Sequence, residues 1–272
     1  MGSRRARALG TDAEDRPVSP DTPIATAAAD SAVVVGASSG LGRALATELA
    51  RHGHAVLLVA SDRRDVDALA ADLQLRHGVP ARGLALDLAR SADPGGAVRA
   101  ALDGLPPLGA VLIPAGWSRH DDDGTLDTAA IGQLLAINLH APLAIAHALL
   151  PALLERRGTL VLFGSVAAER GRGRNIVYAA AKRGLVSFAQ SLRHRHADGS
   201  LRVQLYQLGF MRSNLTHGLR LPLPTAEPAE VARDVVAGLA RRNGTYYRPG
   251  WWALVALIVR SLPWFVFRRM KD

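Results

Sequence analysis

With 272 residues, of which 49% are hydrophobic, the chain is long enough for one large domain with a substantial core. It contains no cysteine, which excludes disulfides, thiolate metal sites and thiol nucleophiles, and favours a reducing, cytoplasmic compartment. Its nine histidines lack a ligand spacing such as His-x-x-x-His, so we expect no metal. The net charge is +9, and residues 241–272 carry seven Lys or Arg against one Asp. A nucleic-acid-binding protein would spread such charge over a groove-binding element, so we expect no nucleic acid partner.

The first thirty residues differ from the rest. They are rich in Ala, Asp, Pro and Thr, and carry four arginines against five acidic residues. This composition predicts a disordered leader over 1–30. The segment lacks the apolar stretch of a signal peptide, so we expect no export.

From Ser31 onward, short apolar runs alternate with segments of helical period. This alternation predicts an α/β fold with a parallel sheet covered by helices on both faces, in one domain over 31–248. The expected strands are 32–35, 55–59, 82–86, 109–113, 159–163, 201–207 and 244–247. The expected helices are 41–52, 63–77, 95–103, 127–155, 175–197 and 228–241.

A glycine-rich loop follows the first expected strand. The loop, Gly36-Ala37-Ser38-Ser39-Gly40-Leu41-Gly42, leads directly into a helix. Glycine permits a tight turn and a close approach of the backbone to a pyrophosphate, and the helix N-terminus supplies N–H groups for it. The loop therefore predicts a dinucleotide site formed by Gly36, Ser38, Ser39, Gly40, Leu41 and Gly42.

The second expected strand should end near the adenosine ribose of such a cofactor. An acidic residue at that point favours NAD, but the chain has Ala60-Ser61-Asp62-Arg63. Ser61 and Arg63 are suited to a 2′-phosphate, which favours NADP(H), although Asp62 is near enough to keep NAD(H) open. Asp87, after the third strand, is placed to accept from the adenine amino group.

Tyr178 and Lys182 lie one helical turn apart, so their side chains share a face of the helix. A nearby ammonium favours the phenolate, so we expect Lys182 to lower the pKa of Tyr178. A phenol tuned in this way exchanges a proton with a carbonyl or an alcohol. Ser165 ends an apolar strand, which places its hydroxyl at the edge of the sheet.

Together these features resemble the short-chain dehydrogenase/reductase family over residues 31 to about 240. The match consists of Gly36-x-x-x-Gly40-x-Gly42, Asp87, Asn138, Ser165, Tyr178 and Lys182. The resemblance implies a Rossmann-type doubly wound sheet and an NAD(P)-dependent oxidoreductase. It implies Tyr178 as the general acid, Lys182 on the nicotinamide ribose, Ser165 on the substrate carbonyl and Asn138 holding a water. The alternative for Asn138 is a helix-interior residue bonded to nearby backbone.

Three positions depart from the family pattern. Val35 replaces the Thr before the first glycine, and Ile113-Pro114-Ala115-Gly116 replaces Asn-Asn-Ala-Gly, which leaves Ala115 and Gly116 as the cofactor wall. In the family the polar side chains at these two places are hydrogen-bonded to each other. Both places are apolar here, so neither leaves an unpaired buried polar group. Leu208-Gly209 replaces Pro-Gly, which predicts a looser loop near the nicotinamide.

The tail, residues 249–272, combines an apolar run with a basic end. Trp251 to Val259 is apolar, Arg260 and Pro263 interrupt it, and Trp264-Phe265-Val266-Phe267 precedes Arg268-Arg269-Met270-Lys271. A bilayer span needs about 20 apolar residues, so the tail is too short and broken to cross one. It fits a helix lying at an anionic membrane surface. The alternative is a helix buried in a subunit interface or against the sheet edge.

The tail, with Glu169-Arg170-Gly171-Arg172, Asn175-x-x-Tyr178 and residues 209–219, resembles one subgroup, the decaprenylphosphoryl-2-keto-ribose reductases. These are the reducing half of the epimerase that makes an arabinose donor for cell walls. The resemblance implies a polyprenyl-linked keto-sugar, a homo-oligomer, and a peripheral position on the inner face of the cytoplasmic membrane. Arg170, Arg172 and Arg174 are then expected to face the substrate, and Arg212 or the tail arginines to meet the lipid phosphate. A soluble ketoreductase of acyl or polycyclic substrates and a catalytically silent nucleotide sensor are the alternatives.

Overall fold

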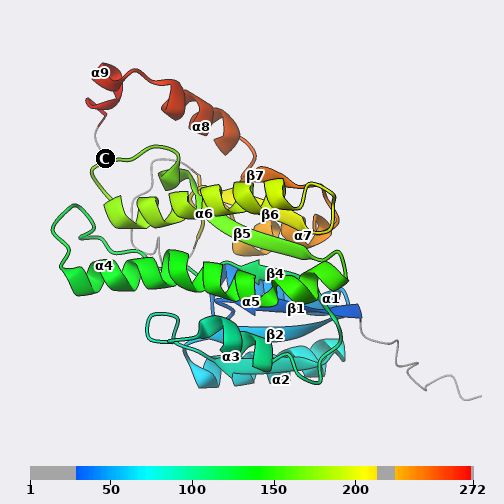
Figure 1. The fold of residues 1–272 in the computed structure, drawn as a ribbon. Coiled ribbons are helices and arrows are strands. Elements are labelled where there is room, and N and C mark those ends of the chain that lie inside the picture. The colour runs from blue at the N-terminus through cyan, green and yellow to red at the C-terminus, as the bar shows by residue number, and fades with distance from the viewer. Residues whose placement is uncertain (1–28, 213–223, 271–272) are drawn as a thin grey trace, which may run out of the picture.

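The structure, a computed structural model, describes residues 29–212 and 224–270 and contains one parallel sheet (Figure 1). The sheet has seven strands in the order β3-β2-β1-β4-β5-β6-β7. The predicted α/β fold is confirmed, and each predicted strand is present to within three residues. The strands are β1 Ala29–Val35, β2 His54–Ala60, β3 Ala81–Ala85, β4 Leu108–Ile113, β5 Thr159–Ser165, β6 Arg202–Leu208 and β7 Gly244–Arg248.

Helices cover both faces of the sheet (Figure 1). Residues of α1, α2 and α7 share one apolar core with one side of the strands, while α3, α5 and α6 share a second core with the other side. Alternate residues of β1 serve the two cores, as a strand buried on both faces requires. These helices are α1 Gly40–Arg51, α2 Arg63–His77, α3 Pro94–Ala100, α5 Ala141–Glu155, α6 Ile176–Arg195 and α7 Pro228–Ala237.

Two boundaries differ from the sequence prediction. β1 begins at Ala29, inside the predicted leader, because Asp30 is tied into the fold: its carboxylate accepts from Arg156 at 2.7 Å and its carbonyl bonds to His54. The rest of the predicted leader lies outside the described residues. The long helix predicted over 127–155 is α4, Thr128–Leu135, a π-turn over Ala136–His140, and then α5.

The strand order reverses between β1 and β4. The glycine loop leaves the carboxyl end of β1, and Ala115 and Gly116 follow the carboxyl end of the neighbouring β4. Ligands of doubly wound sheets bind at such a reversal, outside the carboxyl ends of the strands. The fold therefore places both predicted cofactor segments at one point.

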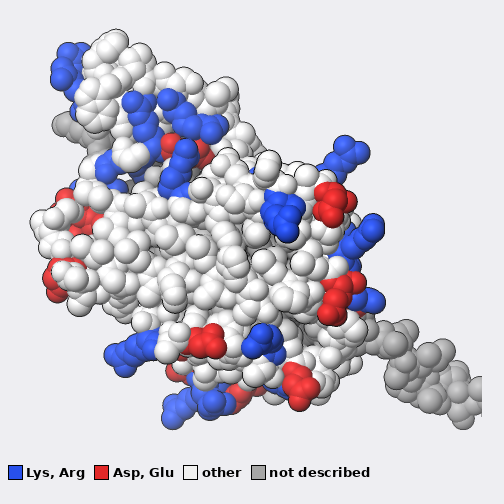
Figure 2. Space-filling model, viewed as in Figure 1, with Lys and Arg blue, Asp and Glu red and all other residues white. Residues whose placement is uncertain are grey.

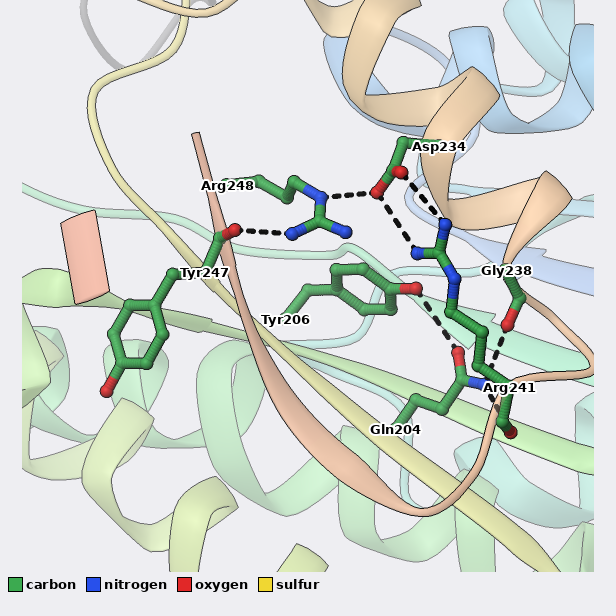
Figure 3. A network of polar contacts seen from close by, with 7 residues as sticks. All are labelled: Gln204, Tyr206, Asp234, Gly238, Arg241, Tyr247 and Arg248. Carbon is green, nitrogen blue, oxygen red and sulfur yellow. Dashed lines mark hydrogen bonds and ion pairs between the residues drawn. The ribbon is translucent and has the colours of Figure 1, made fainter. Parts of the chain in front are cut away.

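Polar side chains fasten β7 to β6 and α7 (Figure 3). Asp234 of α7 pairs with Arg248 at the end of β7 and with Arg241. Gln204 of β6 donates to the carbonyl of Gly238 at 2.9 Å and accepts from Tyr206. Arg248 thereby holds the strand from which the tail continues, while the ring of Tyr247 points away from this network (Figure 3).

The tail forms two helices beyond β7, α8 Trp252–Ser261 and α9 Trp264–Phe267, drawn in orange-red and red (Figure 1). Among the described residues, one helical run, Thr128–Glu155, is long and apolar enough to cross a membrane by length and composition. Its Ile145, Leu149 and Leu153 are buried in the core, as in a core helix of a globular domain.

Candidate active site

The glycine loop is a tight turn whose backbone leaves no room for a side chain at Gly36 or Gly42. Gly36 has a φ of +93°, and its N–H donates to the carbonyl of Val59 at 2.7 Å. A Cβ on Gly42 would lie 1.8 Å from the carbonyl oxygen of Gly36, and one on Gly36 would lie 2.9 Å from Ala115 Cα. Glycine at these two positions therefore lets the backbone of the loop approach itself and Ala115, which follows β4, closely.

The N-terminus of α1 is available to a ligand. Aspartates cap the helices α2, α3 and α4 through Asp62, Asp93 and Asp127, whereas Ser39 makes no side-chain cap bond to α1. The first N–H groups of a helix carry a partial positive charge and need acceptors. At a glycine-rich turn they fit a pyrophosphate. The binding of a dinucleotide by Gly36, Ser38, Ser39, Gly40, Leu41 and Gly42 stays a prediction, and the uncapped N-terminus of α1 is compatible with it.

The wall opposite this loop survives the loss of its polar side chains. The N–H of Ala115 donates to the carbonyl of Val35 at 2.9 Å, so β1 and β4 remain joined where Val35 and Pro114 replace polar residues. Gly116 lies at the next position, where a Cβ would be 3.3 Å from Lys182 Nζ. Ala115 and Gly116 therefore line the strand reversal without a polar side chain.

The adenosine-side residues are exposed at the ends of β2 and β3. Asp62 is engaged as the cap of α2, where its carboxylate accepts from the N–H groups of Arg64 and Asp65. Ser61 is exposed, and Arg63 is 3.9 Å from the exposed Asp67. Asp87 accepts from Ala89 N at 2.9 Å. Nothing in these contacts tests the predicted roles of Ser61, Arg63 and Asp87.

The structure brings Ser165, Tyr178 and Lys182 together at the carboxyl end of β5. Ser165 ends β5, and Tyr178 and Lys182 lie in the first two turns of α6. The Ser165 hydroxyl accepts from Ala167 N and is hydrogen-bonded to the Tyr178 phenol. Lys182 Nζ is buried and donates to the carbonyls of Ala115 and Phe163, each at 3.2 Å. The ammonium thus reaches the cofactor wall.

The pKa of Tyr178 is opposite in direction to the sequence prediction. Burial raises it above its ordinary value, and the hydrogen bond with Ser165 only partly offsets the rise. Lys182 does not lower it, because Nζ is directed at two carbonyls and lies 5.9 Å from the centre of the Tyr178 ring. Burial also lowers the pKa of Lys182 to about 8. Tyr178 and Lys182 do lie one turn apart on α6, but burial has the largest effect on the pKa of Tyr178.

Asn138 lies in the π-turn and faces the same point. Its Nδ2 donates to the carbonyls of Trp117 and Leu134, and its Oδ1 accepts from Trp117 N at 3.1 Å. A Cβ on Gly116 would lie 3.4 Å from that Oδ1, beside Lys182. The side chain is therefore committed to backbone, as in the alternative interpretation, while one Oδ1 lone pair remains for a water.

Asp122 is a residue of the site that the sequence did not indicate. It is 1% exposed, and its two carboxylate oxygens accept from Val177 N at 3.0 Å and Tyr178 N at 2.9 Å. It therefore caps α6, which carries Tyr178, from a distant loop. Because three aspartates follow one another over 121–123, sequence alone offers no way to choose Asp122.

The side chain of Arg170, predicted to face the substrate, is bound to the tail. Its guanidinium donates to the carbonyls of Val259 and Leu262 at the end of α8 and lies 4.1 Å from the ring centre of Phe267. It therefore holds the tail. Arg172 and Arg174 are exposed, so their predicted contact with a substrate stays open.

The loop after β6 begins with a tight contact, while residues 213–223 of the segment predicted to be looser lie outside the described residues. Gly209 N donates to the carbonyl of Arg248 at 2.9 Å, and a Cβ on Gly209 would lie 1.8 Å from the indole nitrogen of Trp252. Arg212, predicted for a lipid phosphate, is paired with Glu227 at 3.2 Å. Residues 213–219 of the subgroup segment lie outside the described residues.

Comparisons with known proteins agree with this architecture. A family model described as short chain dehydrogenase matches residues 30–223. Carbonyl reductase family member 4 of Danio rerio is 30% identical over 216 residues, which cover 75% of this chain and 89% of the relative. The 3-oxoacyl-acyl-carrier-protein reductase of Escherichia coli is 28% identical over 226 residues, 79% and 91% of the two chains.

A solved short-chain dehydrogenase of Sphingobium yanoikuyae, in complex with NADPH, has a TM-score of 0.75 at 26% identity and covers 90% of this chain and 97% of its own. The family model spans more than half of the chain, from β1 through the loop after β6. The chain is an oxidoreductase that belongs to the short-chain dehydrogenase family.

Proposed function

We propose that the protein is a nicotinamide-dependent reductase of ketones that uses Tyr178 as its general acid. The observation that carries this proposal is the convergence of Ser165, Tyr178 and Lys182 beside the strand reversal. The cofactor residues fit a dinucleotide because the glycine loop is closed and the α1 N-terminus lacks a side-chain cap. When bound, the nicotinamide supplies the two electrons of the reduction.

The side chains of this site supply the proton chemistry. Tyr178 has a raised pKa, so its phenol is protonated near neutral pH and donates to the carbonyl oxygen as that oxygen gains charge. Ser165 donates to the same oxygen and orients the ketone. Lys182, whose Nζ reaches the cofactor wall, would hold the nicotinamide ribose hydroxyls, and Asn138 would hold a water that returns the proton to Tyr178.

For the cofactor we propose NADP(H) in preference to NAD(H). The support is that Asp62, the acid nearest the end of β2, is already the cap of α2, while Ser61 and Arg63 are exposed beside it. An NADPH-bound relative of similar fold is consistent with this choice. Titration of the protein with NADPH and with NADH tests it directly, and tighter binding of NADH would overturn it.

For the substrate we propose a lipid-linked ketone, in particular a polyprenyl-linked keto-sugar of cell-wall synthesis, used by an enzyme peripheral to the inner face of the cytoplasmic membrane. The support is the exposed apolar surface of the tail, which lies next to the active-site end of the sheet. We also propose that the chain, with its 31–248 domain and 249–272 tail, is a homo-oligomer. A soluble acyl ketoreductase is the second candidate, favoured by the likeness to the 3-oxoacyl-acyl-carrier-protein reductase.

The experiment that tests the reaction follows NADPH oxidation with a panel of lipid-linked, acyl and water-soluble ketones. Tyr178→Phe should lower the rate by about 100- to 10,000-fold and leave NADPH binding unchanged, because it removes only the acid. Tyr246→Phe is the matched control, since its hydroxyl bonds to the Arg242 carbonyl away from the site. Equal, measurable rates for Tyr178→Phe and the wild type would exclude Tyr178 as the acid, whereas NADPH binding without oxidation by any ketone of the panel would favour a nucleotide-binding sensor.

A further inference from the structure

The tail has one buried face and one exposed apolar face. On α8, Leu254, Leu257 and Ile258 are all exposed at helical spacing, whereas Trp252 and Ala256 are buried on the other side. The exposed apolar set continues in Trp264, Phe265 and Met270, and Trp264 is 66% exposed. Folded domains rarely leave so much contiguous apolar surface without a partner.

The charges of the tail are mostly of one sign. Residues 249–272 contain Arg260, Arg268, Arg269 and Lys271 against the single acid Asp272, and Arg260 pairs with Glu169 of the neighbouring loop. Figure 2 shows the tail as a projecting, mostly uncharged surface with basic side chains at its tip and base. An apolar face edged by cations complements an anionic phospholipid surface. A second copy of the chain would instead bring the same cations to the same interface.

The buried face of the tail is fastened to the loop that follows Ser165. Arg170 caps the end of α8 by donating to the Val259 carbonyl at 3.0 Å and to the Leu262 carbonyl, and it stacks over Phe267 of α9. One side chain of the active-site loop thus holds both helices of the tail.

Glu169 adds a second fastening from the neighbouring position. Its side chain is only 2% exposed, and its carboxylate accepts from the Tyr247 hydroxyl at 2.7 Å and pairs with Arg260 at 3.5 Å. Burial, followed by this hydrogen bond, raises the pKa of Tyr247 to about 12, so the hydroxyl remains a donor. A buried carboxylate needs such partners, and both come from β7 and the tail.

We propose that the exposed face of α8 and α9 binds an anionic bilayer, and that Glu169 and Arg170 hold this face at a fixed orientation to the active-site loop. The inference deepens the proposed function, because it names the surface that would bring a lipid-linked ketone to Tyr178. Membrane binding would then present the site at the level of the headgroups.

The docking surface is tested by flotation of the full chain with vesicles. Vesicles of phosphatidylcholine with phosphatidylglycerol should carry the protein upward, and phosphatidylcholine alone should carry much less. The double variant L254E/F265E should lose binding by about tenfold or more, because both side chains are exposed in the free protein and buried in the membrane. Added salt should weaken the remaining binding.

Leu75→Glu is the matched control for that variant. Leu75 is 87% exposed on α2, remote in sequence from the tail, so its replacement should leave vesicle binding unchanged. Equal flotation of the wild type and L254E/F265E would overturn the proposal. So would a wild type that ignores vesicles and sediments as a dimer that L254E/F265E dissociates, since the face would then meet a second copy.

The fastening is tested by Arg170→Ala with Arg172→Ala as its control, because Arg172 is exposed in the same loop. Chymotrypsin should cleave the tail of the Arg170 variant about tenfold faster, as local opening becomes easier, and that of the control at the wild-type rate. Unchanged cleavage in Arg170→Ala would overturn the fastening. Reduction of a water-soluble ketone without vesicles measures the proposed chemistry separately, so its failure is distinguishable from failure to bind vesicles.

Discussion

The glycine loop and the tail both depend on a glycine that accepts a close neighbour, but the neighbours differ in their distance along the chain. Gly42 lies against Gly36 within one loop, while Gly209 lies against Trp252 from the helix beyond β7. The loop is a local backbone device that its sequence encodes. The tail contact joins two segments that are distant in the sequence, and the sequence of neither one predicts the contact.

Between the glycine loop and the tail, the largest expected effect comes from Gly42→Ala in the loop. A Cβ would lie 1.8 Å from the Gly36 carbonyl oxygen, so the turn must shift. NADPH binding should weaken by about 10- to 100-fold, the equivalent of ~1.4–2.7 kcal/mol, in line with the cost of overpacking. Fluorescence titration measures this. Gly132→Ala in α4, where a Cβ meets nothing within 4 Å, should leave binding intact; equal losses would refute the local explanation.

The pH dependence of turnover tests the role of Lys182, which contacts the cofactor wall beside that loop. Lys182 has a pKa of about 8, so it is charged below that pH and neutral above it. If the ammonium is needed, kcat/KM should fall about tenfold per pH unit above this value. Lys182→Arg, which does not titrate in this range, should lose that limb. The same limb in the variant would assign it to another group.

The free energy of unfolding of the cofactor-free protein should also depend on the titration of Lys182, but it should rise with pH where kcat/KM falls. Between pH 8 and 10.5, the ordinary lysine value, the unfolded chain binds more protons than the folded one. The free energy of unfolding should therefore rise with pH over this window as far as Lys182 contributes. Urea unfolding of wild type and Lys182→Met at several pH values measures the difference.

On the tail side, Gly209→Ala should displace Trp252. The cost should be about 1–3 kcal/mol of tail stability, because the added Cβ meets the buried indole. Hydrogen exchange over 252–261 measures it. In the double variant with Trp252→Ala the two losses should not add, since the clash is gone. Simple additivity would mean that Gly209 acts elsewhere.

The smallest effect is expected at Asp122. Asp122→Ala removes the cap of α6 and should cost ~1 kcal/mol, with a several-fold lower kcat as Tyr178 loses its fixed position. NADPH affinity should hold. Asp122→Asn, which keeps one acceptor, should restore part of the rate, whereas Asp123→Ala, at an exposed neighbour, should change little. A kcat unchanged in Asp122→Ala would limit the residue to stability.

The sequence predicted the central strands because β1, β2, β4 and β5 are short apolar runs with residues in both cores. It predicted the glycine loop because the requirement is local. It also predicted that Tyr178 and Lys182 share a helix face with Ser165 at a strand end. The sequence did not indicate the π-helical turn at Asn138, because the apolar residues continue through 136–140 as they do in an ordinary helix.

What the sequence determined by itself was therefore the α/β order, the positions of the cofactor loop and the proton-transfer residues, and the composition of the tail. Each follows from neighbours in the chain. The tertiary structure decided that burial raises the pKa of Tyr178, that Asp122 caps its helix, and that Arg170 holds the tail. These depend on which distant segments meet and exclude water, and that is settled only when the sheet brings the ends of β5, β6 and β7 together.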